Sequence, residues 1–338
     1  MGVNISDLVS RKEISFDALK GKIIAVDAYN ALYQFLSSIR GADGSPLQDS
    51  KGRVTSHLQG LFSRTLNLMS KGIKLVYVFD GKAPVLKLQE QERRRHLKEG
   101  AEEKYQEALE EEDIELMSKY SRQFSRLNSE MIKESKELLE TLGLPVIEAP
   151  SEAEAQAAHM CSKGDVYAVA SSDYDALLFG SPRLVRNLTL SQKRKVPGGK
   201  YVHTFLEFVE LEKMLNELCI SREQLIVLGI LVGTDFNIGG VKGIGPKKAL
   251  KLVQASEHNF KTLFDDLDVR FDWKEIYELF KHIPVTDSYT LKWKDVDEKK
   301  VRKLLVDEHD FSLERVNSSL EKLYEMKEKD QKGLNSFF

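Results

Sequence analysis

The chain has 338 residues, of which 41% are hydrophobic and 30% charged, and its formal net charge is −3. This length suffices for one large core or two closely packed ones, and no apolar run approaches the roughly 18 to 20 residues of a membrane span. The net charge gives no argument for nucleic acid, so a basic surface would have to come from local clustering. Cys161 and Cys219 lack metal or disulfide spacing, and we expect free thiols in a reducing interior.

The first part of the chain predicts alternating strands and helices. Residues 22–27 (KIIAVD) form a strand-like run, a helical pattern follows at residues 31–36, and residues 55–70 are amphipathic at helical spacing. A second strand is expected at residues 74–80 (KLVYVFD). This strand–helix–strand order predicts a right-handed crossover and a parallel sheet.

Residues 86–137 differ in composition from the rest. They are dense in charge, with a basic run at residues 93–96 (RRRH) and an acidic run at residues 110–113 (EEED). Such a segment is typical of a solvated helical face or a coiled-coil arm. A long helical segment between two parts of a sheet also suggests an insertion that covers something.

The sheet is expected to resume in the second half of the chain. Residues 144–148 and 166–170 (VYAVA) are short apolar runs that predict strands. Residues 184–201 predict a strand pair around the basic turn 192–195 (QKRK). Residues 224–233 predict an apolar helix, and the chain beyond is expected to be mostly helical.

Acidic side chains recur where these predicted elements end or begin. The carboxyl ends of parallel strands lie at one edge of a sheet, where ligands bind in open α/β folds. Carboxylates that converge there repel one another unless cations neutralise them, and hard divalent ions with oxygen ligands suit such a site. The seven candidates are Asp27, Asp80, Glu152, Glu154, Asp173, Asp175 and Asp235.

This donor set favours magnesium. It contains no His or Cys, which argues against zinc and for Mg²⁺, with Mn²⁺ as a possible substitute. Two such ions about 4 Å apart can activate a water and stabilise a leaving oxygen in phosphodiester hydrolysis, so a metal-dependent nuclease is the leading interpretation. Each pair also has a structural alternative: Ser151-x-x-Glu154 fits a helix capping box, and Asp173 and Asp175 fit ordinary loop and cap residues.

Residues 241–250 (VKGIGPKKAL) have the form of a helix-hairpin-helix. Gly243 and Gly245 would let backbone N–H groups approach a phosphate at a helix N-terminus, and Lys247 and Lys248 would add positive charge. Such contacts hold a duplex without reading its sequence. The alternative is a Gly-Pro helix break with both lysines in solvent, and we favour the DNA-binding interpretation.

In combination these motifs resemble the flap endonuclease family of structure-specific 5′ nucleases over essentially the whole chain. The matching segments are residues 26–28 (VDA), 33–35 (YQF), 55–58 (TSHL), 76–82 (VYVFDGK), 149–156 (APSEAEAQ), 171–175 (SSDYD), 233–235 (GTD) and 243–247 (GIGPK). The resemblance implies an α/β fold with a mostly parallel central sheet flanked by helices, a helical arch or cap insertion, and a helix-hairpin-helix DNA-binding element.

The resemblance also implies an organisation and an activity. The expected parts are an N-terminal nuclease region at 1–98, a helical cap at 99–137, an internal nuclease region at 138–258 with the hairpin at 235–255, a C-terminal helical region at 259–329 and a tail at 330–338. The expected enzyme cuts branched duplex DNA at the base of a 5′ flap, leaves a 5′-phosphate, and has 5′–3′ exonuclease activity. Its expected role is Okazaki-fragment maturation and base-excision repair.

The family's residue roles carry over at matching positions. The resemblance implies that the seven acids bind two Mg²⁺ ions and that Lys87 and Arg94 stabilise the scissile phosphate. Tyr33 matches an aromatic that stacks on the base beside the cut, although a core aromatic is the alternative for this residue alone. The other residues implied to contact DNA are Gly2, Arg40, Arg64, Glu152, Gly233, Asp235, Gly243, Gly245, Lys247 and Lys248.

The C-terminal residues 331–338 (QKGLNSFF) match the family's sliding-clamp-binding pattern. The implied anchors are Gln331, Leu334, Phe337 and Phe338, and a frayed apolar terminus is the alternative. The resemblance implies a monomer bound to the clamp, with no membrane partner. Eukaryotic members usually continue past this motif with a basic tail, so an archaeal-type protein of the cytoplasmic nucleoid is expected rather than a nuclear one.

Three other interpretations stay open. A nucleotidyl-transfer or topoisomerase-type enzyme also pairs a Glu with Asp-x-Asp, but it would not explain Asp27, Asp80 and the glycine hairpin. A non-catalytic scaffold for DNA junctions, tethered to the clamp, would bind without cutting. A related exonuclease that degrades DNA from gaps or ends is the nearest neighbour in function.

Overall fold

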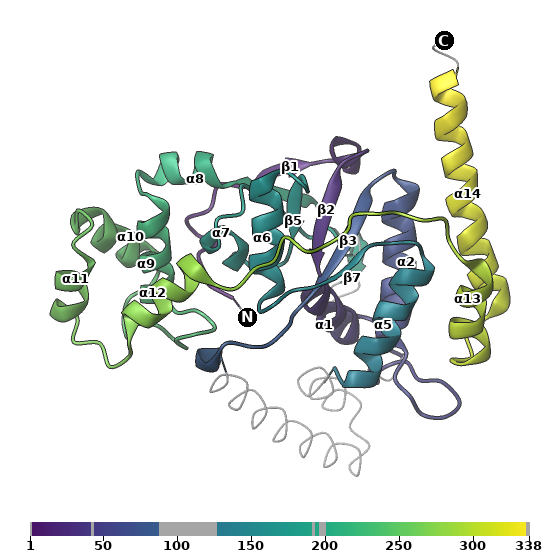
Figure 1. Ribbon diagram of the computed structural model, residues 1–338, viewed down its shortest axis with the longest axis horizontal. Helices are drawn as coiled ribbons and strands as arrows, with labels where there is room; N and C mark the ends of the chain where they lie inside the picture. Colours follow the sequence, from purple (N-terminus) through teal and green to yellow (C-terminus); the bar gives the residue numbers. More distant parts are fainter. Residues whose placement is uncertain (1, 42–43, 88–126, 191–192, 196–200, 336–338) are drawn as a thin grey trace.

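The structure, a computed structural model, describes residues 2–41, 44–87, 127–190, 193–195 and 201–335 (Figure 1). Arg94, most of the segment expected to form the helical cap, and the tail residues Phe337 and Phe338 lie outside the described residues.

Within these ranges the centre of the molecule is a seven-stranded sheet in the order β1-β9-β6-β5-β2-β3-β4. Strands β2 to β6 run parallel to one another, whereas β9 pairs antiparallel with both β6 and β1. This confirms the predicted α/β fold with a mostly parallel sheet. The strands are β1 (Lys12–Ile14), β2 (Ile23–Asp27), β3 (Lys74–Phe79), β4 (Val146–Glu148), β5 (Ala168–Ala170), β6 (Arg183–Arg186) and β9 (Leu206–Glu210).

Helices cover both faces of this sheet (Figure 1). Alternate residues of β3 belong to different cores, because side chains along a strand point to opposite faces. Leu75, Tyr77 and Phe79 pack with α1 (Ala28–Ser38), α2 (Ser56–Ser70) and α5 (Ser129–Thr141). Val76 and Val78 pack with α6 (Ala153–Lys163), α7 (Asp175–Leu178) and α9 (Arg222–Val232). Burial on both faces explains why β3 reads as a continuous apolar run.

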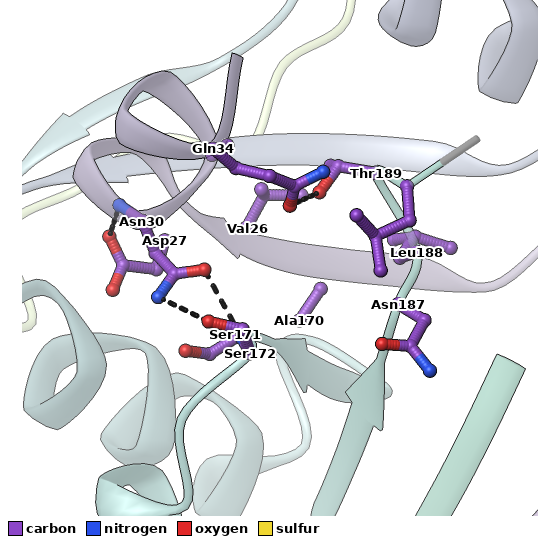
Figure 2. Close-up of a pocket in the computed structure, with 12 residues that line it drawn as sticks. Val26, Asp27, Asn30, Gln34, Ala170, Ser171, Ser172, Asn187, Leu188 and Thr189 are labelled. Atoms are coloured by element: carbon purple, nitrogen blue, oxygen red, sulfur yellow. Dashed lines mark hydrogen bonds between the residues drawn. The ribbon is translucent and has the colours of Figure 1, made fainter. Parts of the chain in front are cut away.

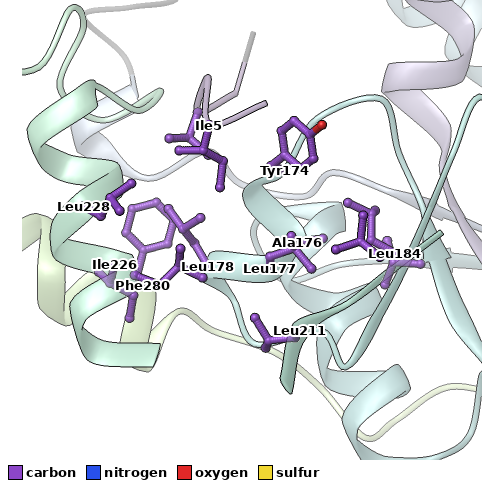
Figure 3. Packing of buried hydrophobic residues seen from close by; sticks show 14 of the residues in the cluster. Ile5, Tyr174, Ala176, Leu177, Leu178, Leu184, Leu211, Ile226, Leu228 and Phe280 are labelled. Carbon is purple, nitrogen blue, oxygen red and sulfur yellow. The ribbon is translucent and has the colours of Figure 1, made fainter. Parts of the chain in front are cut away.

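Figure 3 shows part of the core that anchors α7. Leu177 and Leu178 of α7 are fully buried, as are Ile226 and Leu228 of α9 and Phe280 of α12 (Trp273–His282). Each such side chain stabilises the fold by roughly 1.5 to 3 kcal/mol through the apolar area that it removes from water. Because α7 begins at Asp175, this packing fixes the position of a predicted site residue.

The C-terminal part of the chain adds helices at both ends of the sheet. Helices α8 (Leu211–Leu218), α10 (Pro246–Ala255) and α11 (Phe260–Asp266) precede α12, after which the chain crosses the molecule to α13 (Glu298–Arg302) and α14 (Leu313–Asn335) (Figure 1). Trp293 ties the crossing segment to the sheet, because its Nε1 donates to the carbonyl oxygen of Leu75 at 2.9 Å. None of the helices in the described ranges has the length and apolarity that a membrane crossing requires.

The structure differs from the sequence prediction for residues 184–201. Leu184 and Val185 are fully buried in β6, which joins the central sheet and does not pair with the basic segment. The basic residues Lys193–Lys195 are themselves a strand, β7, and pair with β8 (Tyr201–His203). The expected pair is therefore wrong, because the apolar area buried by joining a large sheet stabilises β6 more than a local hairpin would.

A chain of buried polar side chains joins α2, α5 and the segment before α14. Nε2 of His57 lies 3.3 Å from Oε2 of Glu134, and Nε2 of His309 lies 3.1 Å from Oε1 of Glu134. Nδ1 of His309 lies 3.3 Å from Oδ2 of Asp49, which also accepts a hydrogen bond from Arg53 Nε at 2.8 Å. The side chains of His57, His309 and Asp49 are at most 1% exposed. Glu134 contacts both histidines, so the network depends on it most.

We expect Glu134→Ala to lower the free energy of unfolding by about 2 to 4 kcal/mol, because it leaves His57 and His309 buried without their shared partner. The matched control is Glu137→Ala on the same helix, where the side chain is exposed. Urea unfolding followed by circular dichroism measures both variants. Equal stabilities for the two would show that the network contributes nothing.

Candidate active site

Three predicted site residues meet at one edge of the sheet because their strands are neighbours. Strand β2 lies between β5 and β3 and is parallel to both. Asp27 is the last residue of β2, Asp80 directly follows β3, and Asp173 lies in the segment between β5 and α7. The topology therefore brings these acids to the carboxyl-terminal edge, where open α/β sheets bind ligands.

The N-terminus of α6 joins this edge. Oδ1 of Asp80 accepts a hydrogen bond from the backbone N of Ala153 at 2.7 Å, which connects the end of β3 to the start of α6. The N-cap of α6 is Glu152, and its side chain makes no capping hydrogen bond. The capping box proposed for Ser151 and Glu154 is therefore wrong.

Lys87 connects Glu152 with the segment after α9. Its Nζ donates to Oε2 of Glu152 and lies 3.8 Å from Oδ2 of Asp235. Burial opposes the charged ammonium, but Glu152, Asp80 and Asp235 outweigh this effect and raise the pKa of Lys87. Lys87 thus keeps its positive charge among the carboxylates.

The N-terminal segment reaches the site at Asp175. Oδ1 of this buried carboxylate accepts a hydrogen bond from the backbone N of Val3 at 2.7 Å. A Cβ atom added to Gly2 would lie 2.6 Å from both carboxylate oxygens of Asp175, so no other residue fits there without a shift. Gly2, expected to face DNA, therefore lies directly against a candidate metal ligand.

Asn30, in the first turn of α1, links two of the acids, and Figure 2 shows its bond to Asp27. Its backbone N donates to Oδ1 of Asp27 at 3.0 Å, and its Nδ2 donates to Oδ2 of Asp173 at 3.3 Å. Asn30 was not among the residues predicted from the sequence. An amide side chain three positions after a predicted strand-end acid is the signal that could have identified it.

Burial and mutual repulsion dominate the electrostatics of the site. Burial, with the nearby carboxylate of Asp80, raises the pKa of Asp27 to about 8. Burial raises the pKa of Asp175 to about 7 even though Val3 donates a hydrogen bond to it. Burial and the neighbouring aspartates raise the pKa of Glu154 well above its usual range, and among the described residues its buried Oε1 has no hydrogen-bond partner. A cation would relieve each of these penalties.

The donor set fits hydrated divalent ions. In the described part of the chain, no group of three or more Asp, Glu, His or Cys side chains is arranged to hold a metal ion. Mg²⁺ does not need such a group, because it retains several waters and binds through one or two carboxylates and a substrate phosphate. The unpartnered oxygen of Glu154 and the converging carboxylates are hard oxygen donors of the required kind.

The glycine hairpin presents an open backbone next to basic side chains. Helix α9 ends at Gly233, and α10 begins with Gly245 as its N-cap and proline at its first position. Gly243 has a φ of 79°, which side chains disfavour, and an added Cβ there would meet none of the described atoms within 4 Å. Lys247 and Lys248 are exposed in the first turn of α10. A phosphate can approach this backbone closely.

The other predicted DNA contacts lie on α1, α2 and the segment that follows α1. Tyr33 is 41% exposed, so the alternative of a core aromatic is wrong. Arg40 donates from Nη1 to the carbonyl oxygen of Gly44 at 3.0 Å, and Arg64 is half-buried on α2.

Two of the residues predicted to bind the clamp lie in α14. Gln331 falls within this helix, near its C-terminal end. Leu334 falls in the same helix, in its last turn.

Comparisons with known proteins agree with this geometry. The family models for the XPG N-terminal domain and the XPG I-region match residues 3–101 and 143–235. Flap endonuclease 1 of Pyrococcus abyssi is 55% identical over 340 residues, which cover 100% of this chain and 98% of the relative. The solved structure of flap endonuclease-1 from Methanococcus jannaschii is 44% identical with a TM-score of 0.77, covering 97% of this chain and 100% of that chain.

A more distant structure shares the fold. The catalytic core of Rad2 in complex with a DNA substrate has a TM-score of 0.69 at 23% identity and covers 94% of this chain and 97% of that chain. The fold and its acidic sheet edge define a nuclease of the XPG class. Within that class, the chain belongs to the flap endonuclease family.

The raised pKa of Asp27 predicts a pH-dependent stability. Folded Asp27 holds its proton more tightly than the unfolded chain, so the protein loses stability as pH rises from 3.8 towards about 8. Asp27→Asn removes this loss and keeps a residue that can cap α1. Without divalent ions, we expect this variant to melt a few degrees above wild type at pH 8.5 and to lose most of that advantage at pH 5.

Differential scanning calorimetry measures this difference, with the exposed Asp266→Asn on α11 as control. An advantage of Asp27→Asn that was equal at both pH values would contradict the electrostatic explanation.

Proposed function

We propose that this chain is a structure-specific 5′-flap endonuclease that hydrolyses the phosphodiester at the base of a 5′ flap in branched duplex DNA. The observation that carries the proposal is the convergence of buried, repelling carboxylates from β2, β3, α6 and α7 at one sheet edge. Membership of the flap endonuclease family supports the same activity. The family resemblance adds a 5′–3′ exonuclease activity to the proposal.

The carboxylates would hold two Mg²⁺ ions, with Mn²⁺ as a possible substitute. When bound, the ions supply an activated water and stabilise charge on the leaving oxygen. The protein's part is to keep the oxygen donors in place before substrate arrives. The proposed ligands are Asp27, Asp80, Glu152, Glu154, Asp173, Asp175 and Asp235.

Lys87 would stabilise the negative charge that develops on the scissile phosphate. Its ammonium is charged, lies beside Glu152 and Asp235, and comes from a segment separate from the sheet edge. A fixed positive charge in a site that excludes water is worth far more than the same charge in solvent. Arg94 is proposed for the same role from the family resemblance.

The glycine hairpin would hold the duplex beside this site. The open backbone at Gly243 and Gly245 and the exposed Lys247 and Lys248 suit phosphate contacts, which position DNA without reading its sequence. Exposed Tyr33 suits stacking on an unpaired base. The remaining proposed DNA contacts are Gly2, Arg40, Arg64 and Gly233.

Product mapping on an end-labelled 5′-flap duplex tests the proposal. We expect wild type to cut at the flap junction only with Mg²⁺, and Asp173→Ala to lose at least about 100-fold in rate, because it removes a ligand whose loss leaves the metals poorly held. The panel includes single-stranded, nicked and 3′-flap substrates.

Each alternative predicts a different product pattern. Binding without cutting would indicate a junction scaffold, and stepwise shortening from ends would indicate an exonuclease. Full activity of Asp173→Ala would exclude the proposed metal site.

We also propose that the C-terminal residues bind a DNA sliding clamp and that the protein acts with it in Okazaki-fragment maturation and base-excision repair. The support is the pattern of Gln331, Leu334, Phe337 and Phe338, in which apolar anchors of a short segment would insert into a pocket of the partner. From the family resemblance we propose that the protein acts as a monomer in the nucleoid of an archaeal cell.

Deletion of residues 331–338 separates the clamp from the chemistry. We expect it to abolish stimulation of cleavage by the clamp and to leave basal cleavage within about twofold, because the tail would supply the apolar anchors of that interface. Cleavage assays with and without the clamp measure both quantities. Equal loss of stimulated and basal activity would refute this role for the tail.

A further inference from the structure

Two of the proposed metal ligands sit on a segment that belongs to no strand. Residues 171–175, here called the acidic loop, run from the end of β5 to the first residue of α7 and carry Asp173 and Asp175. Burial and repulsion from neighbouring acids act on Asp175, and without a counterforce they would push the loop away from Asp27 and Glu154. The structure provides contacts to this loop from two sides.

On one side Asn30 binds the loop with three hydrogen bonds, and Figure 2 shows those that it makes with Ser172. Its Nδ2 donates to Oγ of Ser172 at 2.8 Å and to Oδ2 of Asp173 at 3.3 Å, and its Oδ1 accepts from the backbone N of Ser172 at 3.2 Å. Its own backbone N donates to Asp27. One residue of α1 therefore holds the carboxylate that ends β2 and the first carboxylate of the acidic loop.

On the other side Arg186, at the end of β6, binds the same loop. Its Nε donates to the carbonyl oxygen of Ser172 at 3.0 Å, and its Nη1 donates to the hydroxyl of Tyr174 at 2.7 Å. The guanidinium also lies 4.3 Å from the centre of the Tyr174 ring. Glu207 on β9 accepts from Nη1 at 2.6 Å and orients the guanidinium. Arg186 thus fixes the two residues that flank Asp173.

We propose that Asn30 and Arg186 are positioning residues that brace the acidic loop, so that Asp173 and Asp175 are held at ligand geometry before metal and DNA bind. This inference rests on the proposed function. Partners that orient metal ligands typically contribute about 10- to 100-fold to metal affinity or activity. Neither side chain takes part in the chemistry itself.

A purely structural role predicts a different result from a positioning role. If the brace only stabilised the fold, Asn30→Ala would lower the melting temperature and leave the Mg²⁺ dependence of the reaction unchanged. If the brace positions the ligands, the variant needs more Mg²⁺ for half-maximal rate, while its affinity for flap DNA without divalent ions stays the same.

The test is single-turnover cleavage of a 5′-flap duplex across a Mg²⁺ titration for wild type, Asn30→Ala, Asn30→Asp and Arg186→Met. We expect each variant to lose about 10- to 100-fold in rate at low Mg²⁺, to recover partly at high Mg²⁺, and to keep DNA affinity within about twofold. Asn30→Asp retains the acceptor for Ser172 but not the donor to Asp173, so it should not restore the wild-type dependence of the rate on Mg²⁺. Arg186→Lys, which keeps the charge, should be impaired less than Arg186→Met.

The matched control is Thr189→Val. Its hydroxyl shares a 2.8 Å hydrogen bond with Oε1 of Gln34 in a small cavity that Asn30 and Ser172 also line, but it does not touch the acidic loop (Figure 2). We expect this variant to show the wild-type Mg²⁺ curve. The same Mg²⁺ curve for Asn30→Ala and wild type would overturn the brace, whereas full activity of Asp173→Ala would overturn the proposed function on which it rests.

Discussion

Burial and mutual repulsion of carboxylates raise the pKa of Asp27 to about 8 and that of Asp175 to about 7, and the surrounding structure works against this repulsion. The backbone supplies a donor to each of three acids from a different segment, namely Asn30 N to Asp27, Ala153 N to Asp80 and Val3 N to Asp175. These contacts hold acids together that would otherwise separate. The site is therefore kept ready to bind cations, and this lowers the stability of the folded protein, as stability–function trade-offs predict.

The sheet makes this arrangement rigid. Strands β5, β2 and β3 are adjacent and parallel, and helices pack on both faces, so their carboxyl ends cannot shift without disrupting two cores. The less regular parts of the site receive separate support. Lys87 adds a charge next to Glu152, and the acidic loop is held by Asn30 and Arg186. The nuclease site thus combines a fixed edge with braced loops.

The glycine hairpin and the acidic edge are connected through α9. This helix is buried along most of its length, and Asp235 and the hairpin follow its C-terminal end at Gly233. The rigid helix α9 would therefore fix the position of a duplex bound at Gly243 and Gly245 relative to the acidic side chains. This geometry suits an enzyme that selects DNA by its branched shape, because phosphate contacts position a duplex and do not specify its sequence.

The sequence alone determined the buried strands β2 and β3, their terminal acids and the hairpin, because these depend on local apolar patterns, strand ends and glycine chemistry. It misjudged residues 184–201, where β6 joins the sheet, and it missed Asn30 and Arg186. Those features are decided by which distant segments meet: Asn30 contacts residues 142 and 143 positions away. The tertiary structure also decided that, among the described residues, Oε1 of Glu154 lacks a hydrogen-bond partner, since pKa shifts and unsatisfied oxygens depend on burial and on neighbours that only the folded chain brings together.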